Sequence, residues 1–227
     1  MKKIILILII IPIIGISQQE YYKWDIGING GVNINNPIVK GENLTLDDLG
    51  GQLYGLTFIY HFNRFFAFKV DLDIENRGWA MEQFGDKNDG SGDPELKNIS
   101  QVLDYFDIPA FMHVGFGKKF KVDLNIGPYF GFKIKDEIIS YDSDGTELDE
   151  SATRGKIGLS EFDNFDFGVV YGIGFDYQIH ERFSIGFDAL YERGLKAVNK
   201  INDTDYKNSS FDFDFGINFH LRKKKKK

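Results

Sequence analysis

Residues 211–221, just before a basic C-terminal run, read FDFDFGINFHL. Every second residue is large and apolar, and the residues between them are Asp, Gly, Asn or His. Alternation with a period of two predicts a β-strand with two unlike faces. The apolar face of such a strand packs against either a protein core or lipid. The rest of the sequence must therefore show which of the two these Phe side chains meet.

The same alternation recurs along the chain. Including the C-terminal stretch, it predicts eight strands, at residues 23–35, 52–62, 66–77, 101–116, 121–135, 165–180, 183–192 and 211–221. A tilted strand of about ten residues is long enough to cross a bilayer. No long apolar run follows the N-terminus, which disfavours a helical membrane protein. An even number of strands is typical of bacterial outer-membrane barrels.

The connections between these strands alternate in length. The short ones are FNR at 62–64, GKK at 117–119 and HER at 180–182, whereas residues 35–51, 78–98, 136–164 and 193–209 form long polar links. We expect short helical turns at 44–48 and 93–98 within the long links. Short periplasmic turns and long extracellular loops are typical of an antiparallel up-and-down transmembrane β-barrel. This all-β fold places both termini on the periplasmic side.

The two faces of the strands decide between lipid and water outside the barrel. A soluble eight-stranded barrel would turn its apolar face inward, but an interior of this size is only just wide enough for side chains. The chain contains 22 Phe residues, and most lie on the apolar face. We therefore predict that the apolar face meets lipid and the polar face lines the lumen. Pro109 and Pro128 fall inside strands, where we expect bulges or breaks in pairing.

The N-terminus has the features of an export signal. Lys2 and Lys3 precede an apolar run at 4–16, and Gly15 and Ser17 suit cleavage before Gln18. We predict a signal peptide at 1–17, an outer-membrane β-barrel domain at 18–221 and a basic tail at 222–227. The chain has no cysteine, so we expect neither lipidation nor disulfides. The predicted location is the outer membrane, reached by export to the periplasm.

The predicted lumen is mostly acidic. Parity directs these acids inward: Asp25, Asp71, Asp73, Glu75, Asp107, Asp123, Asp166, Asp176, Asp188, Glu192, Asp212 and Asp214. It directs these bases inward: Lys23, Lys69, Arg77, Lys121 and Lys133. Because buried charges need partners, we predict a network of ion pairs and hydrogen bonds that fills the lumen. The predicted network residues are Asp25, Lys69, Asp71, Asp73, Glu75, Asp123, Asp176, Asp188, Asp212 and Asp214.

All four histidines, namely His61, His113, His180 and His220, lie near the periplasmic end of a predicted strand with inward parity. Alternate strands stand about 10 Å apart, too far for ready metal coordination, so we predict no metal site. The open alternatives are a polar floor to the barrel and a rim that gains charge below about pH 6.5.

No catalytic constellation is visible in the sequence. The lipid-facing stripes lack Ser and His, so we expect no enzyme activity and no cofactor. The acidic loops GDKNDGSGD at 85–93 and SYDSDGTELDE at 140–150 lack EF-hand spacing. We expect outer-membrane lipid as a partner, no nucleic acid, and an envelope protein partner that the sequence does not identify.

Three stretches carry a resemblance to a known family. YFDIPAFMHVGF at 105–116, NIGPYFGF at 125–132 and FDFGVVYGIGFDY at 165–177 resemble the outer-membrane β-barrel family common in Bacteroidota, called porin family or PorT-like proteins. The resemblance covers essentially the whole mature chain and implies an eight-stranded barrel in the outer membrane. PorT itself is linked to type IX secretion, and no motif specific to that protein stands here.

The last strand also resembles the signal that the barrel-assembly machinery reads. Asp214, Gly216, Phe219 and Leu221 occupy its polar, Gly and two hydrophobic positions in order, although Arg222 and five lysines follow. The resemblance implies the assembly machinery as a partner during biogenesis. For the mature protein we expect a structural or interaction scaffold with a largely plugged lumen and partner-binding loops. The alternatives are a narrow porin-like channel for small cations or solutes and, less favoured, a PorT-like component of type IX secretion.

Overall fold

The computed structural model describes residues 22–40, 46–86, 94–141, 147–148, 162–201 and 204–221. The predicted signal peptide at 1–17 and the basic tail at 222–227 lie outside the described residues. Within the described part of the chain, no helix is long and apolar enough to cross a membrane.

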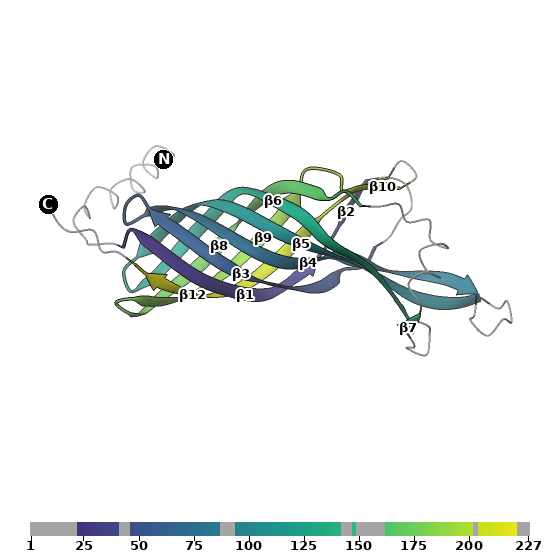
Figure 1. Ribbon diagram of the computed structural model, residues 1–227, viewed down its shortest axis with the longest axis horizontal. Coiled ribbons are helices and arrows are strands. Elements are labelled where there is room, and N and C mark those ends of the chain that lie inside the picture. Colours follow the sequence, from purple (N-terminus) through teal and green to yellow (C-terminus); the bar gives the residue numbers. More distant parts are fainter. Residues whose placement is uncertain are drawn as a thin grey trace, which may run out of the picture.

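Eight long antiparallel strands form a closed barrel (Figure 1). They are β1 (Trp24–Asn35), β3 (Leu49–His61), β4 (Phe66–Asp86), β5 (Pro94–Gly117), β6 (Phe120–Tyr141), β8 (Phe165–His180), β9 (Phe183–Gly194) and β12 (Ser209–His220). Their order is β5-β4-β3-β1-β12-β9-β8-β6, and pairing of β5 with β6 closes the ring. The predicted eight-stranded barrel is confirmed.

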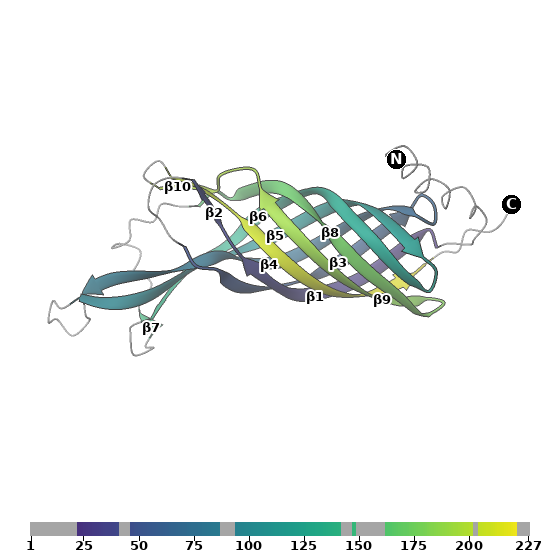
Figure 2. The ribbon, with the colours of Figure 1, turned by 180° about the vertical axis from the view of Figure 1, so that it is seen from behind.

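Both ends of the described barrel chain meet at one mouth. The amide of Leu221 donates to the carbonyl of Trp24 at 2.9 Å, and the short β3–β4, β5–β6 and β8–β9 connections lie at the same mouth (Figure 2). We call this mouth the turn end. The opposite mouth, which carries the long connections, is the loop end.

The loop end differs from the expectation. Strands β4, β5 and β6 are 21, 24 and 22 residues long, so they continue beyond the barrel as a projecting sheet (Figure 1). The helical turn expected at 93–98 is wrong, because Pro94–Asn98 belongs to β5. At 44–48, the described residues form no helical turn, and Asp47 instead bridges to Ala80.

Four short strands also form in the long connections. They are β2 (Ile38–Lys40), β7 (Glu147–Leu148), β10 (Asn199–Ile201) and β11 (Thr204–Lys207). Strands β10, β11 and β2 form a separate three-stranded sheet, and β7 pairs with the end of β6. Loops that looked irregular in the sequence therefore carry strand structure of their own.

The faces of the barrel are apolar outside and polar inside. Phe215 and Ile126 are 66% and 61% exposed, whereas Asp71 and Asp166 are 1% and 0% exposed. This is the reverse of a soluble barrel, and it is the arrangement expected of a barrel surrounded by lipid.

The two strand prolines interrupt the ladder as expected for residues without a donor N–H. Pairing of β5 with β6 is missing between the Pro109–Tyr129 and Met112–Ile126 pairs, a gap that includes Pro128. The register shift between these strands lies elsewhere, at Asp104 and Tyr105. The prolines thus break pairing without forming the bulge.

Gly78 lies where β4 leaves the barrel wall. Its φ is +143°, and a Cβ added there would lie 1.9 Å from the carbonyl oxygen of Gln101 on β5. A side chain at this position therefore faces both backbone strain and a backbone clash.

We predict that Gly78→Ala destabilises the barrel by roughly 1–3 kcal/mol because of that strain. The measurement is the urea midpoint of the folded band, which migrates differently from unfolded protein in gels. Gly50→Ala is the matched control, because nothing lies within 4 Å of its added Cβ. Equal midpoints for the two variants would contradict the prediction.

Candidate functional site

The lumen holds its charged side chains in three tiers, and the lowest lies at the turn end. Asp25 accepts from two histidines: its Oδ2 lies 2.7 Å from His61 Nε2 and its Oδ1 lies 2.7 Å from His220 Nδ1. The ring of His220 also stacks on Tyr22, with centroids 4.6 Å apart. This carboxylate joins β1 to both of its neighbours, β3 and β12.

The other two histidines do not join that cluster. His113 Nδ1 lies 2.8 Å from Asn125 Oδ1, on the opposite wall. His180 is exposed at the end of β8, where the register with β9 shifts after Gln178, and its ring centroid lies 6.3 Å from that of the outward-facing Phe183. Its expected inward orientation is therefore wrong, and the four histidines form no single ring.

The middle tier centres on Lys69. Its ammonium lies 2.7 Å from Asp188 Oδ2 and 3.2 Å from Asp71 Oδ2. Asn125 donates to both Asp188 and Asp123, at 3.0 and 3.1 Å. This tier links strands β4, β6 and β9 across the lumen.

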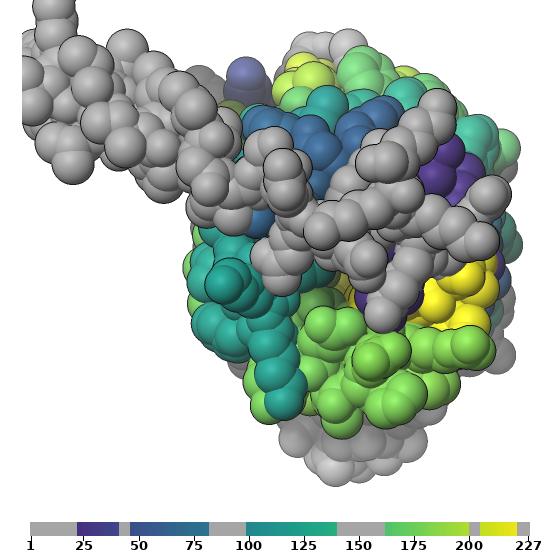
Figure 3. All heavy atoms as spheres, turned by 90° about the vertical axis from the view of Figure 1, so that its left-hand side faces the viewer, coloured from purple at the N-terminus to yellow at the C-terminus, as the bar shows by residue number. Residues whose placement is uncertain are grey.

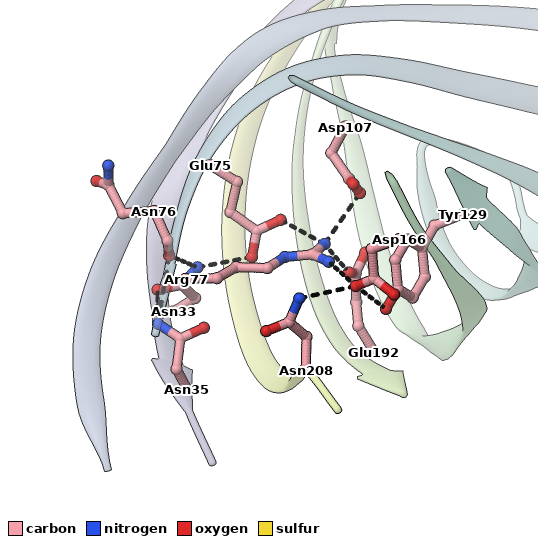
Figure 4. Close-up of polar contacts among 10 residues, drawn as sticks. All are labelled: Asn33, Asn35, Glu75, Asn76, Arg77, Asp107, Tyr129, Asp166, Glu192 and Asn208. Atoms are coloured by element: carbon pink, nitrogen blue, oxygen red, sulfur yellow. Dashed lines mark hydrogen bonds and ion pairs between the residues drawn. The ribbon is translucent and has the colours of Figure 1, made fainter. Parts of the chain in front are cut away.

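The upper tier centres on Arg77, which is 1% exposed (Figure 4). Its Nη2 lies 2.8 Å from Glu75 Oε2 and 3.0 Å from Asp107 Oδ2, and it also pairs with Glu192. Its Nη1 lies 3.4 Å from Asp166 Oδ2. One guanidinium thus ties β4, β5, β8 and β9 together, and we call Arg77 with these four acids the Arg77 hub.

Aromatic and amide groups complete the hub. The guanidinium lies 4.6 Å from the ring centroid of Tyr129, whose hydroxyl donates to Asp166 at 3.0 Å. Asn208 also donates to Asp166, at 2.8 Å, and Asn33 donates to Glu75 at 2.7 Å. These contacts fix the carboxylates around the buried cation (Figure 4).

Three buried carboxylates, of Glu75, Glu192 and Asp212, each offer an oxygen within 4.8 Å of the others. Arg77 already contacts the first two, and a guanidinium beside them opposes a second cation. The predicted absence of a metal site stays a prediction.

Apolar side chains fill much of the lumen above the middle tier. Phe111, Tyr129, Val170 and Leu190 form a buried cluster inside the barrel. At the loop end a second cluster, the apolar cap, consists of Trp79, Leu103, Tyr105, Phe162, Val198 and Tyr206. The rings of Trp79 and Tyr206 lie 4.3 Å apart, and burial raises the pKa of Tyr206 well above its usual range.

Two small cavities lie in the turn-end half of the lumen. They measure about 80 Å³ and about 40 Å³, and both are lined by Asp25, His61, Lys121, Asp176 and His220. The lumen is therefore polar and partly open toward the turns, and packed toward the loops.

The predicted network residues fall into different tiers. Asp25 binds histidines, Lys69 binds Asp71 and Asp188, and Glu75 joins the hub. The structure places the rest of the set as follows: Asp73 accepts from Asn29, Asp123 accepts from Asn125, Asp176 lines the cavities, and Asp212 and Asp214 are buried with one carboxylate oxygen each unpartnered.

The predicted set omits Arg77, which has the most ion pairs among the described residues. Parity placed Arg77, Asp107, Asp166 and Glu192 in the lumen, but it could not show that one guanidinium contacts all three acids. Lys23 was expected to face the lumen. Its ammonium instead lies 5.3 Å from the ring centroid of Tyr60, which packs on the exposed Trp24. By the same parity the apolar residues Phe111, Tyr129, Val170 and Leu190 face inward, but the predicted polar lumen did not include them.

The four residues of the predicted assembly signal lie on β12 and just after it. Asp214 is buried toward the lumen, whereas Leu221 is exposed outside. Phe219 packs on Phe183 with centroids 5.1 Å apart, and Gly216 faces Gly186 across the ladder. Their role in assembly remains a prediction.

A closed barrel with an apolar exterior and a charged, hydrogen-bonded lumen defines a transmembrane β-barrel protein. The family model of the outer membrane protein β-barrel domain matches residues 16–200. The chain belongs to this family, and its location is the outer membrane.

Solved structures of bacterial surface proteins are similar to the chain. Neisserial surface protein A is 8% identical, with 90% of this chain and 100% of that chain covered and a TM-score of 0.45. Ail of Yersinia pestis is 17% identical, with 87% and 99% covered and a TM-score of 0.42. OprG from Pseudomonas aeruginosa is 16% identical, with 88% and 98% covered and a TM-score of 0.47. Comparison with curated proteins gave no match.

We predict that Arg77→Met destabilises the barrel by about 3–5 kcal/mol, because it leaves buried carboxylates without a cation. The measurement is the urea midpoint of the folded band. Arg193→Met is the control: Arg193 follows Glu192 on β9 but is exposed on the outer wall, so its removal should shift the midpoint little. A midpoint for Arg77→Met within error of the control would show that the hub does not stabilise the barrel.

Proposed function

We propose that the protein is an outer-membrane scaffold with a closed lumen that presents a projecting β-sheet to a partner outside the cell. The observation that carries the proposal is the continuous filling of the loop-end half. The Arg77 hub spans the lumen, and the apolar cap lies above it. Short turns mark the periplasmic side of such barrels, which assigns the loop end to the outside.

The projecting sheet, which we call the β-arm, consists of residues 79–86 of β4, 94–101 of β5 and 138–141 of β6, with β7. The β4 and β5 segments pair from Trp79–Gln101 as far as Asp86–Pro94. Among the described residues, 81–86 of β4 pair only with β5, so no described strand occupies their other edge. An open edge is a template for an extended segment of a partner.

A second candidate is a narrow pathway for small cations. It is favoured by the two turn-end cavities and by the surplus of lumen carboxylates over Lys69 and Arg77. The finer family assignment, a PorT-like protein of type IX secretion, rests on the short motifs at 105–116, 125–132 and 165–177 alone.

We predict that the purified barrel gives no steady current in planar bilayers, because a hydrated ion has no continuous path through the hub and cap. The comparison is a variant with Trp79→Ala and Tyr129→Ala, which removes one large ring from the cap and one from beside the hub. Its wider lumen makes a current easier to detect. Cation-selective steps from the unmodified protein would overturn the closed scaffold in favour of the channel.

We predict that trimming the β-arm abolishes recovery of the protein partner while the barrel still folds. Met81 and Ile99 face each other in the ladder, so residues 82–98 can be replaced by Asn-Gly as a two-residue turn. The measurement is affinity capture from native outer membrane, with folding checked by gel migration.

Deletion of Lys223–Lys227 is the control for this capture, since it leaves the arm intact. Equal partner recovery by the trimmed and full-length proteins would contradict binding at the arm. Recovery of secretion components with the full-length protein would favour the PorT-like assignment.

A further inference from the structure

Outward-facing aromatic rings gather at the turn end. Ring pairs join Trp24 to Tyr60, Phe120 to Phe175 and Phe183 to Phe219, with centroids 4.6, 6.0 and 5.1 Å apart. Aromatic side chains at this level are typical of the membrane interface, where the ring meets both acyl chains and headgroups.

Basic side chains lie over aromatic rings at the same end of the barrel. Lys23 lies 5.3 Å from the centroid of Tyr60, Arg64 lies 4.2 Å from that of Phe65, and Lys119 lies 5.2 Å from that of Tyr177. The three basic residues come from different segments of the turn end. The charged heads of Lys23 and Lys119 therefore stand against outward rings, at headgroup level, whereas Arg64 also lines the larger turn-end cavity.

Between two of the turns the rim is hollowed. A groove of about 490 Å³ is lined by Lys118, Lys119, Gln178, Ile179, His180 and Glu181. Its two sides belong to the β5–β6 and β8–β9 turns, which are neighbours at the rim, in teal and green (Figure 3). We call it the rim groove.

The backbone holds the two sides of the rim groove together. The amide of Gln178 donates to the carbonyl of Lys119 at 2.8 Å, and Phe120 pairs with Tyr177 in the adjoining ladder. Lys118 and Lys119 are exposed, so their ammonium groups are accessible to a ligand. The shape of the groove does not depend on a long, separate loop.

Charge and apolarity adjoin each other in this groove. Its lining has two lysines against one acid, Glu181, which gives an excess of positive charge. Ile179, Tyr177 and Phe120 are 57%, 41% and 53% exposed on the adjoining outer wall. A ligand that fits carries a negative head and an apolar body aligned with the barrel wall.

We propose that the rim groove binds an anionic phospholipid of the periplasmic leaflet, with its phosphodiester between Lys118 and Lys119 and its acyl chains along Tyr177 and Ile179. An acidic protein segment fits less well, because exposed apolar side chains, Phe120, Tyr177 and Ile179, line or adjoin the groove. Each lysine contributes to binding of an anionic headgroup by charge attraction, about fivefold in affinity.

The test is native mass spectrometry of the full chain in detergent with equal amounts of phosphatidylglycerol and phosphatidylcholine. The unmodified protein should retain phosphatidylglycerol preferentially. Lys118→Gln, which leaves Lys119 on the ring of Tyr177, should reduce that retention about fivefold, and the double change Lys118→Gln, Lys119→Gln about 25-fold. Equal retention of the two lipids by the unmodified protein would overturn the proposal.

Two control variants test whether lipid retention depends on the rim groove or on basic residues elsewhere in the chain. Lys135→Gln with Lys207→Gln removes the same charge at the loop end and should leave retention unchanged. Deletion of Lys223–Lys227 removes the basic tail and should preserve the preference. Loss of preference in the tail deletion, with the double groove variant unaffected, would assign the lipid to the tail and refute the rim groove.

Discussion

Every backbone N–H and C=O of a strand that crosses a bilayer needs a partner within the protein, because lipid offers none. Pairing of β5 with β6 meets this requirement by leaving the ring of eight strands without an edge. The gap around Pro109 and Pro128 is short, and pairing resumes in the same register beyond it. Closure with eight strands fixes a narrow interior, so the size of the lumen and the need to fill it both follow from backbone hydrogen bonding.

Filling that interior with charged residues creates a second constraint. Asp73 faces Asp107 across the ladder, and Asp188 faces Asp214. Like charges directly opposite one another are destabilising. The two buried cations of the described residues stand at these places: Arg77 contacts Asp107, and Lys69 contacts Asp188. The cations therefore act as cross-strand links, and each relieves a repulsion that the barrel register itself imposes.

Much of the barrel could be predicted from the sequence because a period of two specifies both strand and face. Local parity does not report contacts across the lumen, which depend on strand stagger. The alternation predicted the inward position of Arg77 but not its partners. It predicted the wrong orientation for His180, because the register shifts there. The loop end was least predictable. Trp79, Phe162, Val198 and Tyr206 lie in the long links between the predicted strands, where no periodic pattern indicates that they form one cluster.

The free-energy cost of opening the lumen differs between its two ends. At the turn end the cavities already reach Asp25 and Lys121 among polar side chains. At the loop end, opening would expose the cap residues, and re-exposing a large apolar side chain costs about 1.5–3 kcal/mol. It would also separate Arg77 from acids on three other strands. These terms act together, because the cap residues Trp79 and Tyr105 lie on the strands that carry Arg77 and Asp107. An open state is therefore a cooperative rearrangement of cap and hub, and only a ligand that binds it far better than the closed state could populate it.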